Sequence, residues 1–290
     1  MKTPLRLSRY CMDGGVLPNA QAKSSQVNGV IVEFNGGYGC MQAWSALGDC
    51  PLEFHLESLR EGNPTSMGKA CLNCCQIDGD ARRAGVNLLK GLILPRSHYL
   101  FSGLNAGGDF DAQLDLAKAN GVAKVKGGND LSETLDLVER VSEHCRLRID
   151  FNSSLDVKSF ETFISGLSTR AKEQIEFIED PIPYDEAQWT ALSERMGVTL
   201  ALDWGPPDAV NGFGVRIWKP ARHLHAPTGR VHCITHNMDH SLGRRYAAYQ
   251  ASIFKGSLLW CGLDDSFPMD LETGFGLDSE LSTMEWEDFA

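Results

Sequence analysis

The feature that most constrains the fold is an apolar run at residues 175–178 that ends in Glu179, Asp180 and Pro181. Proline cannot donate a hydrogen bond to a sheet, so it is rarely found inside a central strand. We therefore expect a strand that stops here and carries two acids at its C-terminal end. In sheets of parallel strands, that end is where ligands bind and catalysis takes place.

Other apolar runs along the chain also end in charged residues. They end at Lys126, Asp150, Asp203 and Lys219, and amphipathic helices are expected between the strands as far as Asp203. One βα unit of a barrel takes about 30 residues, and most of the spacings are close to that length. This alternation predicts an α/β protein built on a modified TIM (β/α) barrel.

The first part of the chain predicts a different unit, an α+β capping domain over residues 1–95. Strands and helices are expected in this order: strands at 4–10, 27–34 and from 38, then helices at 51–60 and 66–84. Residues 11–26 are mostly polar, so we expect a long loop that acts as a lid. The barrel is then expected over residues 96–290, with the C-terminal tail contributing to the capping domain.

Composition argues against several classes of function. The chain has 290 residues and a net charge of −11, which disfavours a general nucleic-acid-binding surface. No apolar run approaches the ~20 residues that span a bilayer, and the N-terminus lacks the apolar core of a signal peptide. We expect a cytoplasmic monomer that acts on a small-molecule carboxylate, with no nucleic-acid or membrane partner.

The cysteines do not predict a disulfide framework, because their number is odd and no secretion signal is present. The cluster of Cys71, Cys74 and Cys75 could suggest zinc, but no second CxxC motif accompanies it. On the expected helix these three residues share one face. We therefore expect them to be buried as small apolar residues.

The charged strand ends also indicate chemistry. Side chains alternate between the two faces of a strand, so Lys124 and Lys126 point the same way. By the same rule Arg148, Asp150 and Asn152 point together. If these directions lead into the mouth of a barrel, carboxylates from successive strands meet there beside lysines.

Converging carboxylates predict a metal site. Asp150, Glu179 and Asp203 would repel one another unless a divalent cation that prefers oxygen ligands lay between them. Mg²⁺ is the expected ion, with Mn²⁺ as an alternative. Lysines beside such a site could carry protons, because nearby positive charge lowers the pKa of a lysine.

The ordered set of strand ends resembles the enolase superfamily, and within it the o-succinylbenzoate synthase family. The matching motifs are Lys-x-Lys at 124–126, the stretches 148–152, 177–181, 217–220 and 234–243, and the last-strand stretch 262–264. The resemblance covers nearly the whole chain and is weakest in the capping domain. It implies an α+β capping domain followed by a modified TIM barrel.

The resemblance also implies a reaction. This is the Mg²⁺-dependent syn-dehydration of 2-succinyl-6-hydroxy-2,4-cyclohexadiene-1-carboxylate to 2-succinylbenzoate in menaquinone biosynthesis, which makes the protein a carbon–oxygen lyase. The catalytic residues it implies are Lys126 as the base and Lys219 across the site, with Asp150, Glu179 and Asp203 as metal ligands. The supporting or substrate-binding residues it implies are Lys124, Arg148, Asn152, Thr235, His236 and Asn237.

Some features depart from the family pattern and keep alternatives open. The connections after Asp203 and Lys219 are too short for a full helix, so the barrel is expected to be trimmed there. His236 and His240 are expected to be structural rather than catalytic, and Trp204 to be a packing residue. The alternative functions are a racemase or epimerase acting on N-acylamino acids or dipeptides, and a non-catalytic barrel. The adjacent pair at 264–265 disfavours a dipeptide epimerase, in which Asp-x-Asp is typical.

Overall fold

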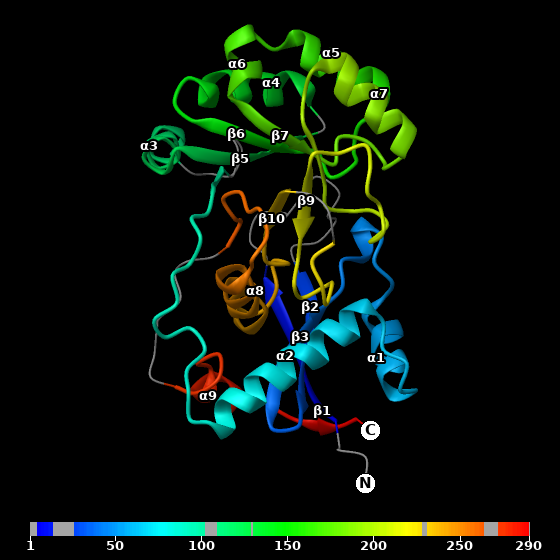
Figure 1. Cartoon of the computed structure of the whole chain (residues 1–290), viewed down its shortest axis with the longest axis vertical. Helices are drawn as coiled ribbons and strands as arrows, with labels where there is room; N and C mark the ends of the chain where they lie inside the picture. Colours follow the sequence, from blue (N-terminus) through cyan, green and yellow to red (C-terminus); the bar gives the residue numbers. More distant parts are fainter. Residues whose placement is uncertain are drawn as a thin grey trace.

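The computed structural model describes residues 5–13, 26–101, 109–128, 130–227, 231–263 and 272–289. These residues form two sheets, an antiparallel one near the chain termini and a curled parallel one (Figure 1). No helix in these ranges is long and apolar enough to cross a bilayer. The predicted combination of a β/α barrel and an N-terminal α+β unit is confirmed.

The antiparallel sheet has the strand order β11-β1-β2-β3. Its strands are β1 (Arg6–Asp13), β2 (Gln26–Phe34), β3 (Gly37–Gln42) and β11 (Glu287–Asp288). β11 pairs with β1, so the C-terminal end of the chain completes this sheet. The division at residue 95 stays a prediction.

The hairpin of β1 and β2 corrects one expectation. Residues 11–26 were expected to be loop, but pairing continues outward to Asp13 opposite Gln26. Backbone pairing with a neighbouring strand outweighs the weak strand preference of Asp13 at the end of β1. Residues 14–25, where the lid was expected, lie outside the described residues.

Two helices, α1 (Leu52–Arg60) and α2 (Ser66–Arg83), belong to this N-terminal part. The predicted burial of Cys71, Cys74 and Cys75 on one face of α2 is confirmed. The helix comes very close to β3, because a Cβ atom on Gly37 would lie 2.0 Å from the Cys75 carbonyl oxygen. Glycine at this position allows the helix and the sheet to pack directly.

The parallel sheet runs in the order β10-β9-β8-β7-β6-β5-β4. Its strands are β4 (Tyr99–Phe101), β5 (Val122–Lys126), β6 (Arg146–Asp150), β7 (Ile175–Glu179), β8 (Leu200–Leu202), β9 (Val215–Trp218) and β10 (Val231–Ile234). Residues 258–262 make parallel bridges to β10 and the following Thr235 on one side, and Cys261 bridges Ser97 on the other. This segment therefore joins the two edges of the curled sheet.

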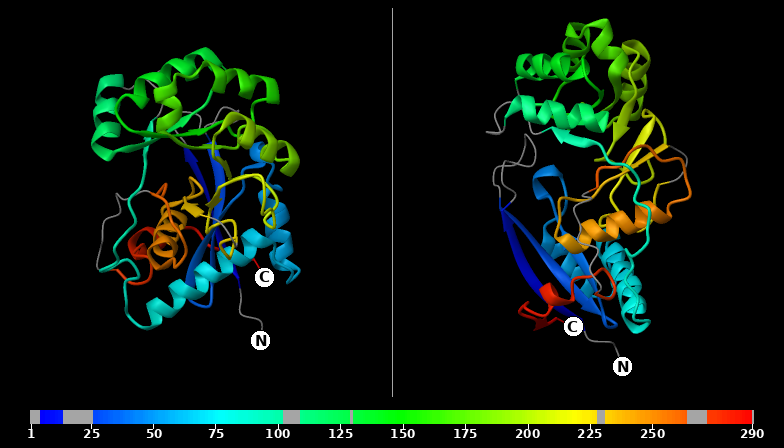
Figure 2. Two further views of the ribbon diagram at one scale, coloured as in Figure 1. Left: turned by 45° about the horizontal axis from the view of Figure 1, so that its top comes forward. Right: turned by 90° about the vertical axis from the view of Figure 1, so that its left-hand side faces the viewer.

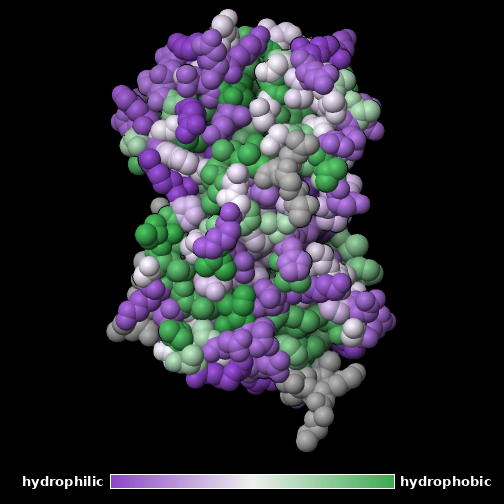
Figure 3. All heavy atoms as spheres, viewed as in Figure 1, coloured by the Kyte–Doolittle hydropathy of each residue, from purple (hydrophilic) through white to green (hydrophobic). Residues whose placement is uncertain are grey.

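Helices cover the outer face of the first strands of the parallel sheet (Figure 2). They are α3 (Phe110–Asn120), α4 (Leu131–Ser142), α5 (Val157–Gly166), α6 (Thr169–Gln174) and α7 (Glu186–Met196). Asp109 caps the N-terminus of α3 with its side chain, and Gly121 ends the helix in the left-handed conformation, as these residue types commonly do. On the face seen in Figure 3, hydrophilic side chains are frequent over this part of the molecule.

The predicted trimming of the barrel is confirmed on its other side. Residues 203–214, all of which are described, connect β8 to β9 without a helix. The described part of the next connection, residues 219–227, also has none. The remaining helices are η1 (Ser45–Leu47), α8 (Ser241–Ile253) and α9 (Asp278–Leu281). Side chains of α8 pack with those of the antiparallel sheet, which joins the two parts of the protein.

Candidate active site

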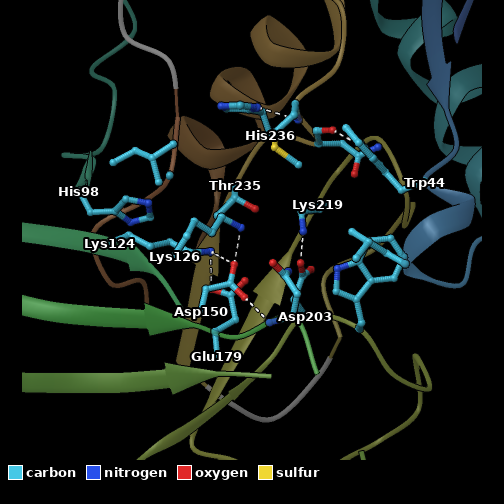
Figure 4. A pocket seen from close by; sticks show the side chains of 17 residues that line it. Trp44, His98, Lys124, Lys126, Asp150, Glu179, Asp203, Lys219, Thr235 and His236 are labelled. Carbon is cyan, nitrogen blue, oxygen red and sulfur yellow. Dashed lines mark hydrogen bonds and ion pairs between the residues drawn. The ribbon is translucent and has the colours of Figure 1, made fainter. Parts of the chain in front are cut away.

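One pocket lies at the C-terminal ends of the parallel strands, facing the N-terminal part (Figure 4). Because parallel strands end on the same side of a sheet, charged residues that are far apart in sequence meet here. All the predicted site residues except Arg148 line this pocket: Lys124, Lys126, Asp150, Asn152, Glu179, Asp203, Lys219, Thr235, His236 and Asn237. Their chemical roles stay predictions.

The lysines and acids form two groups in the pocket. On one side the Nζ atom of Lys124 lies 2.9 Å from Asp150 and 2.7 Å from Glu179, and the Nζ atom of Lys126 lies 2.6 Å from Asp150. On the other side Lys219 pairs with Asp203. In Figure 4 Lys126 and Lys219 thus approach the pocket from different sides.

Burial and charge set the protonation of the first group. Burial opposes the charged form of Lys124, but Asp150 and Glu179 outweigh it and raise the pKa of the ammonium group. Burial likewise opposes ionisation of Asp150, but Lys124 and Lys126 lower its pKa. For Glu179, burial and then the charge of Asp150 raise the pKa to about 6. Lys124 is therefore a fixed positive charge beside Lys126.

The lysines differ in their exposure to the pocket. The Lys126 side chain is 27% exposed, whereas those of Lys124 and Lys219 are 10% exposed. An amine that exchanges protons with a substrate must be reachable by it. Lys126 is the best placed of the three for this task.

Asp180 is a buried acid that organises the second group. Its carboxylate accepts hydrogen bonds from the backbone N–H groups of Asp203, at 3.1 Å, and Trp204, at 2.9 Å. Its own backbone has a φ of 42°, in the left-handed region that non-glycine residues rarely adopt. Asp180 thereby holds the chain just after β8 in the position that points Asp203 into the pocket. The sequence placed Asp180 at a strand end, but it gave no sign of this supporting role.

The donor set suits Mg²⁺ in chemistry and position, because three carboxylates from successive strands line one pocket. Within the described residues, however, no three His, Cys, Asp or Glu side chains are arranged as a ready metal-binding group. Lys124 bridges Asp150 and Glu179 instead, and Lys219 contacts Asp203. Binding of Mg²⁺ therefore requires these ammonium groups to move away from the carboxylates.

Arg148 lies beneath the pocket rather than in its wall. Its side chain is fully buried, and its guanidinium group donates to Glu176 at 2.6 Å and to the Trp260 carbonyl oxygen at 2.6 Å. One of its nitrogens lies 2.9 Å from Nδ1 of His98, which does line the pocket. Burial, and then the charge of Arg148, lower the pKa of His98 well below its usual value. Arg148 can therefore support a neutral His98, but it cannot touch a ligand in the pocket as the pocket stands.

The residues after β10 form the wall that faces the N-terminal part. Asn237 donates from its side chain to the Gln42 carbonyl oxygen at 3.0 Å, and its own carbonyl oxygen accepts from the Trp44 indole at 2.9 Å. Among the described residues, neither Oγ1 of Thr235 nor Oδ1 of Asn237 has a hydrogen-bond partner. Buried polar atoms of this kind are suited to hydrogen bonds with a ligand.

Sequence reasoning missed several pocket residues. Trp44 and Leu47 reach the pocket from the N-terminal part, and His98 and Trp204 from the barrel. No local pattern marked the first three, because their position depends on how distant segments pack. Trp204 was expected to be only a packing residue, yet it follows the charged end of β8 directly, and that was an available signal. His240, in contrast, caps α8 through Nδ1 and pairs with Glu280, as a structural residue does.

The end of the barrel sequence is only partly described. Gly262, from the predicted last strand, bridges Thr235. Asp264 and Asp265, which bear on the epimerase alternative, lie outside the described residues.

Comparisons with known proteins agree with this architecture. The family described as "O-succinylbenzoate synthase, N-terminal domain" matches residues 5–81. An o-succinylbenzoate synthase from Bdellovibrio bacteriovorus is 28% identical in an alignment of length 314 that covers 92% of this chain and 93% of the relative.

Solved structures share the fold. A dipeptide epimerase from Methylococcus capsulatus, complexed with Mg and the dipeptide L-Arg-D-Lys, has a TM-score of 0.67 at 19% identity, covering 95% of this chain and 99% of that chain. An L-talarate dehydratase from Polaromonas sp. JS666, complexed with Mg and L-glucarate, has a TM-score of 0.63 at 16% identity, covering 91% of this chain and 87% of that chain. At these identities the likeness shows the fold alone. The predicted resemblance is confirmed: residues 5–81 match the N-terminal domain of o-succinylbenzoate synthases, the chain is similar to one synthase over most of its length, and its curled parallel barrel shares the fold of these solved structures.

Proposed function

We propose that this protein is an o-succinylbenzoate synthase, which dehydrates 2-succinyl-6-hydroxy-2,4-cyclohexadiene-1-carboxylate to 2-succinylbenzoate in menaquinone biosynthesis. We also propose that residues 1–95 form the capping domain and residues 96–290 the barrel. The observation that carries the proposal is the placement of two lysines on different sides of a pocket lined by three carboxylates. The similarity to a synthase over most of both chains supports it.

In the proposed mechanism Lys126 acts first as a base. Its neutral Nζ takes the proton on the carbon that carries the substrate carboxylate. The resulting ammonium group then gives that proton to the departing hydroxyl group, which leaves as water. Because one lysine performs both transfers, the proton and the hydroxyl group leave from the same face of the ring.

The other residues bind and orient the substrate. Asp150, Glu179 and Asp203 would hold Mg²⁺, which when bound supplies positive charge for the substrate carboxylate and for the charge that develops on proton loss. Lys219 would stabilise that charge from the opposite side, with a cation–π contact to the ring. Thr235 and Asn237 would form hydrogen bonds with the substrate along the wall that faces the N-terminal part. Trp44 would shield the site from water.

An ultraviolet assay tests this function. The purified protein is mixed with the cyclohexadiene substrate and Mg²⁺, and the loss of diene absorbance is compared with the spontaneous decay. We expect acceleration with Mg²⁺, none with excess EDTA, and recovery when Mg²⁺ is restored. Diene loss at the spontaneous rate in all three conditions would contradict the proposed function.

A second candidate is racemisation or epimerisation of N-acylamino acids or dipeptides. The observation that favours it is the approach of Lys126 and Lys219 from different sides, because two bases can exchange a proton on opposite faces of one carbon. The test is solvent deuterium exchange at the α-carbon, followed by mass spectrometry. A synthase should accelerate diene loss and leave these amino-acid derivatives without deuterium, whereas an epimerase should show the opposite pattern.

A further inference from the structure

A second cavity of about 450 Å³ lies next to the pocket, on the trimmed side of the barrel. It is lined by Leu47 and Gly48 from the N-terminal part and by Tyr184, Trp204, Pro206 and Arg222 from the barrel, among others. Leu47 and Trp204 line both cavities, so these two side chains form the boundary between them. We call this second space the outer cavity.

Arg222 supplies positive charge to the outer cavity. The residue is only 9% exposed, and its guanidinium carbon lies 3.6 Å from the centre of the Trp204 ring. One edge of the guanidinium group pairs with Asp49, while its Nε atom has no hydrogen-bond partner in the described part of the chain. Arginine has five N–H donors in a rigid fork, so one carboxylate does not use all of them.

Arg216 adds a second buried guanidinium group close by. It is 1% exposed, and its Nη1 atom contacts the carbonyl oxygen of Pro206, which lines the outer cavity, at 3.4 Å. Two of its nitrogens, Nε and Nη2, have no hydrogen-bond partner among the described residues. Burial, opposed by Asp203 but assisted by Arg222, lowers the pKa of Arg216. Arg216 thus adds positive charge behind the wall of the outer cavity, and Asp203 and Asp180 offset part of it.

The dimensions of the two cavities indicate how far a ligand must reach from the inner pocket to Arg222. The inner pocket has a volume of only about 80 Å³. The Lys219 ammonium nitrogen lies 5.6 Å from the centre of the Trp204 ring, and the Arg222 guanidinium carbon 3.6 Å from it. The two cations therefore lie within about 9 Å of each other, the sum of these distances. A ligand whose reacting part fills the inner pocket can reach Arg222 with a short chain.

We propose that the outer cavity is a subsite for the second carboxylate of a dicarboxylate ligand, with Arg222 as the residue that binds it. This inference rests on the proposed function, in which the ring carboxylate faces Asp150, Glu179 and Asp203. The succinyl chain then runs past Trp204 to Arg222. The short connection between β8 and β9 leaves the space that the chain enters.

Binding of two ligands tests this subsite. The ligands are 2-succinylbenzoate and 2-butanoylbenzoate, in which a methyl group replaces the terminal carboxylate. Their dissociation constants are measured by calorimetry with Mg²⁺ for the wild type, Arg222→Ala and Asp49→Asn. We expect the wild type to prefer 2-succinylbenzoate by about tenfold or more, in line with a charge-assisted hydrogen bond. Arg222→Ala should abolish this preference.

Asp49→Asn is the matched control, because it breaks the same ion pair and leaves Arg222 in place. We expect it to keep the preference for 2-succinylbenzoate. The subsite is refuted if Arg222→Ala keeps the preference, or if both variants lose it equally, since loss in both reflects the broken ion pair alone. If neither ligand binds the wild type, the proposed function fails. Diene turnover by the wild type without any preference between the ligands would refute the subsite alone.

Discussion

Asp239 offers a quantitative test of the packing between the two parts of the protein. The residue is buried next to the start of α8, and its Oδ2 atom has no hydrogen-bond partner among the described residues. Burial raises the pKa of Asp239 from 3.8 to about 6. Gly243 packs directly against this carboxyl group, because a Cβ atom on it would lie 2.0 Å from Oδ2.

The sign of the effect follows from proton linkage. The folded protein holds the Asp239 proton to a higher pH than the unfolded chain does. Its contribution to stability is therefore greatest below pH 3.8 and is lost as the pH rises through about 6. A shift of about 2 pKa units corresponds to about 3 kcal/mol in the free energy of unfolding.

Asp239→Asn removes this titration while it keeps the shape of the neutral acid. We expect the free energy of unfolding of the wild type, relative to Asp239→Asn, to fall by up to about 3 kcal/mol between acidic pH and pH 8. Urea denaturation at a series of pH values measures the difference. Asp136→Asn, at an exposed position on α4, is the control and should show no such trend. A difference between the wild type and Asp239→Asn that is flat with pH would show that the pKa of Asp239 is not raised in the folded protein.

Two further predictions concern stability and are checked by urea denaturation. Phe163→Ala should lower the free energy of unfolding by about 3–5 kcal/mol, because the ring is buried and packs edge-on against Phe151, whereas Phe54→Ala at a half-exposed position should change it little. Asp78→Ala should cost about 3–5 kcal/mol, because the buried carboxylate pairs with Arg82 and accepts the backbone N–H groups of Tyr38 and Phe275. Asp80→Ala, an exposed site on the same helix, is its control. Similar losses in either matched pair would contradict the packing described.

Features that depend on local sequence were predictable. The apolar run before Pro181 marked β7, which spans Ile175–Glu179, and Asp109 and Gly121 marked the two ends of α3. The short connection after Asp203 marked the missing helix, since length alone decides whether a helix fits. The convergence of strand ends was also predictable, because parallel strands place their C-terminal ends together.

Features that depend on contacts between distant segments were not predictable. The pairing of Asp13 with Gln26 extends β1 and β2 beyond the strands that the sequence predicted. The ion pair of Asp49 with Arg222 and the contact of Trp44 with Asn237 each join residues far apart in the chain. The sequence placed lysines beside carboxylates, but it did not show that Lys124 would bridge Asp150 and Glu179.

The most direct test of Lys126 as the base is the rate of diene loss in Lys126→Ala with Mg²⁺ present. Lys158→Ala, at an exposed position on α5, is the matched control, and substrate binding is measured alongside by calorimetry. We predict that Lys126→Ala still binds the ligand but reduces diene loss to the spontaneous rate, while Lys158→Ala keeps the wild-type rate. Wild-type turnover by Lys126→Ala would contradict the assignment of Lys126 as the base and, with it, the mechanism proposed for this pocket.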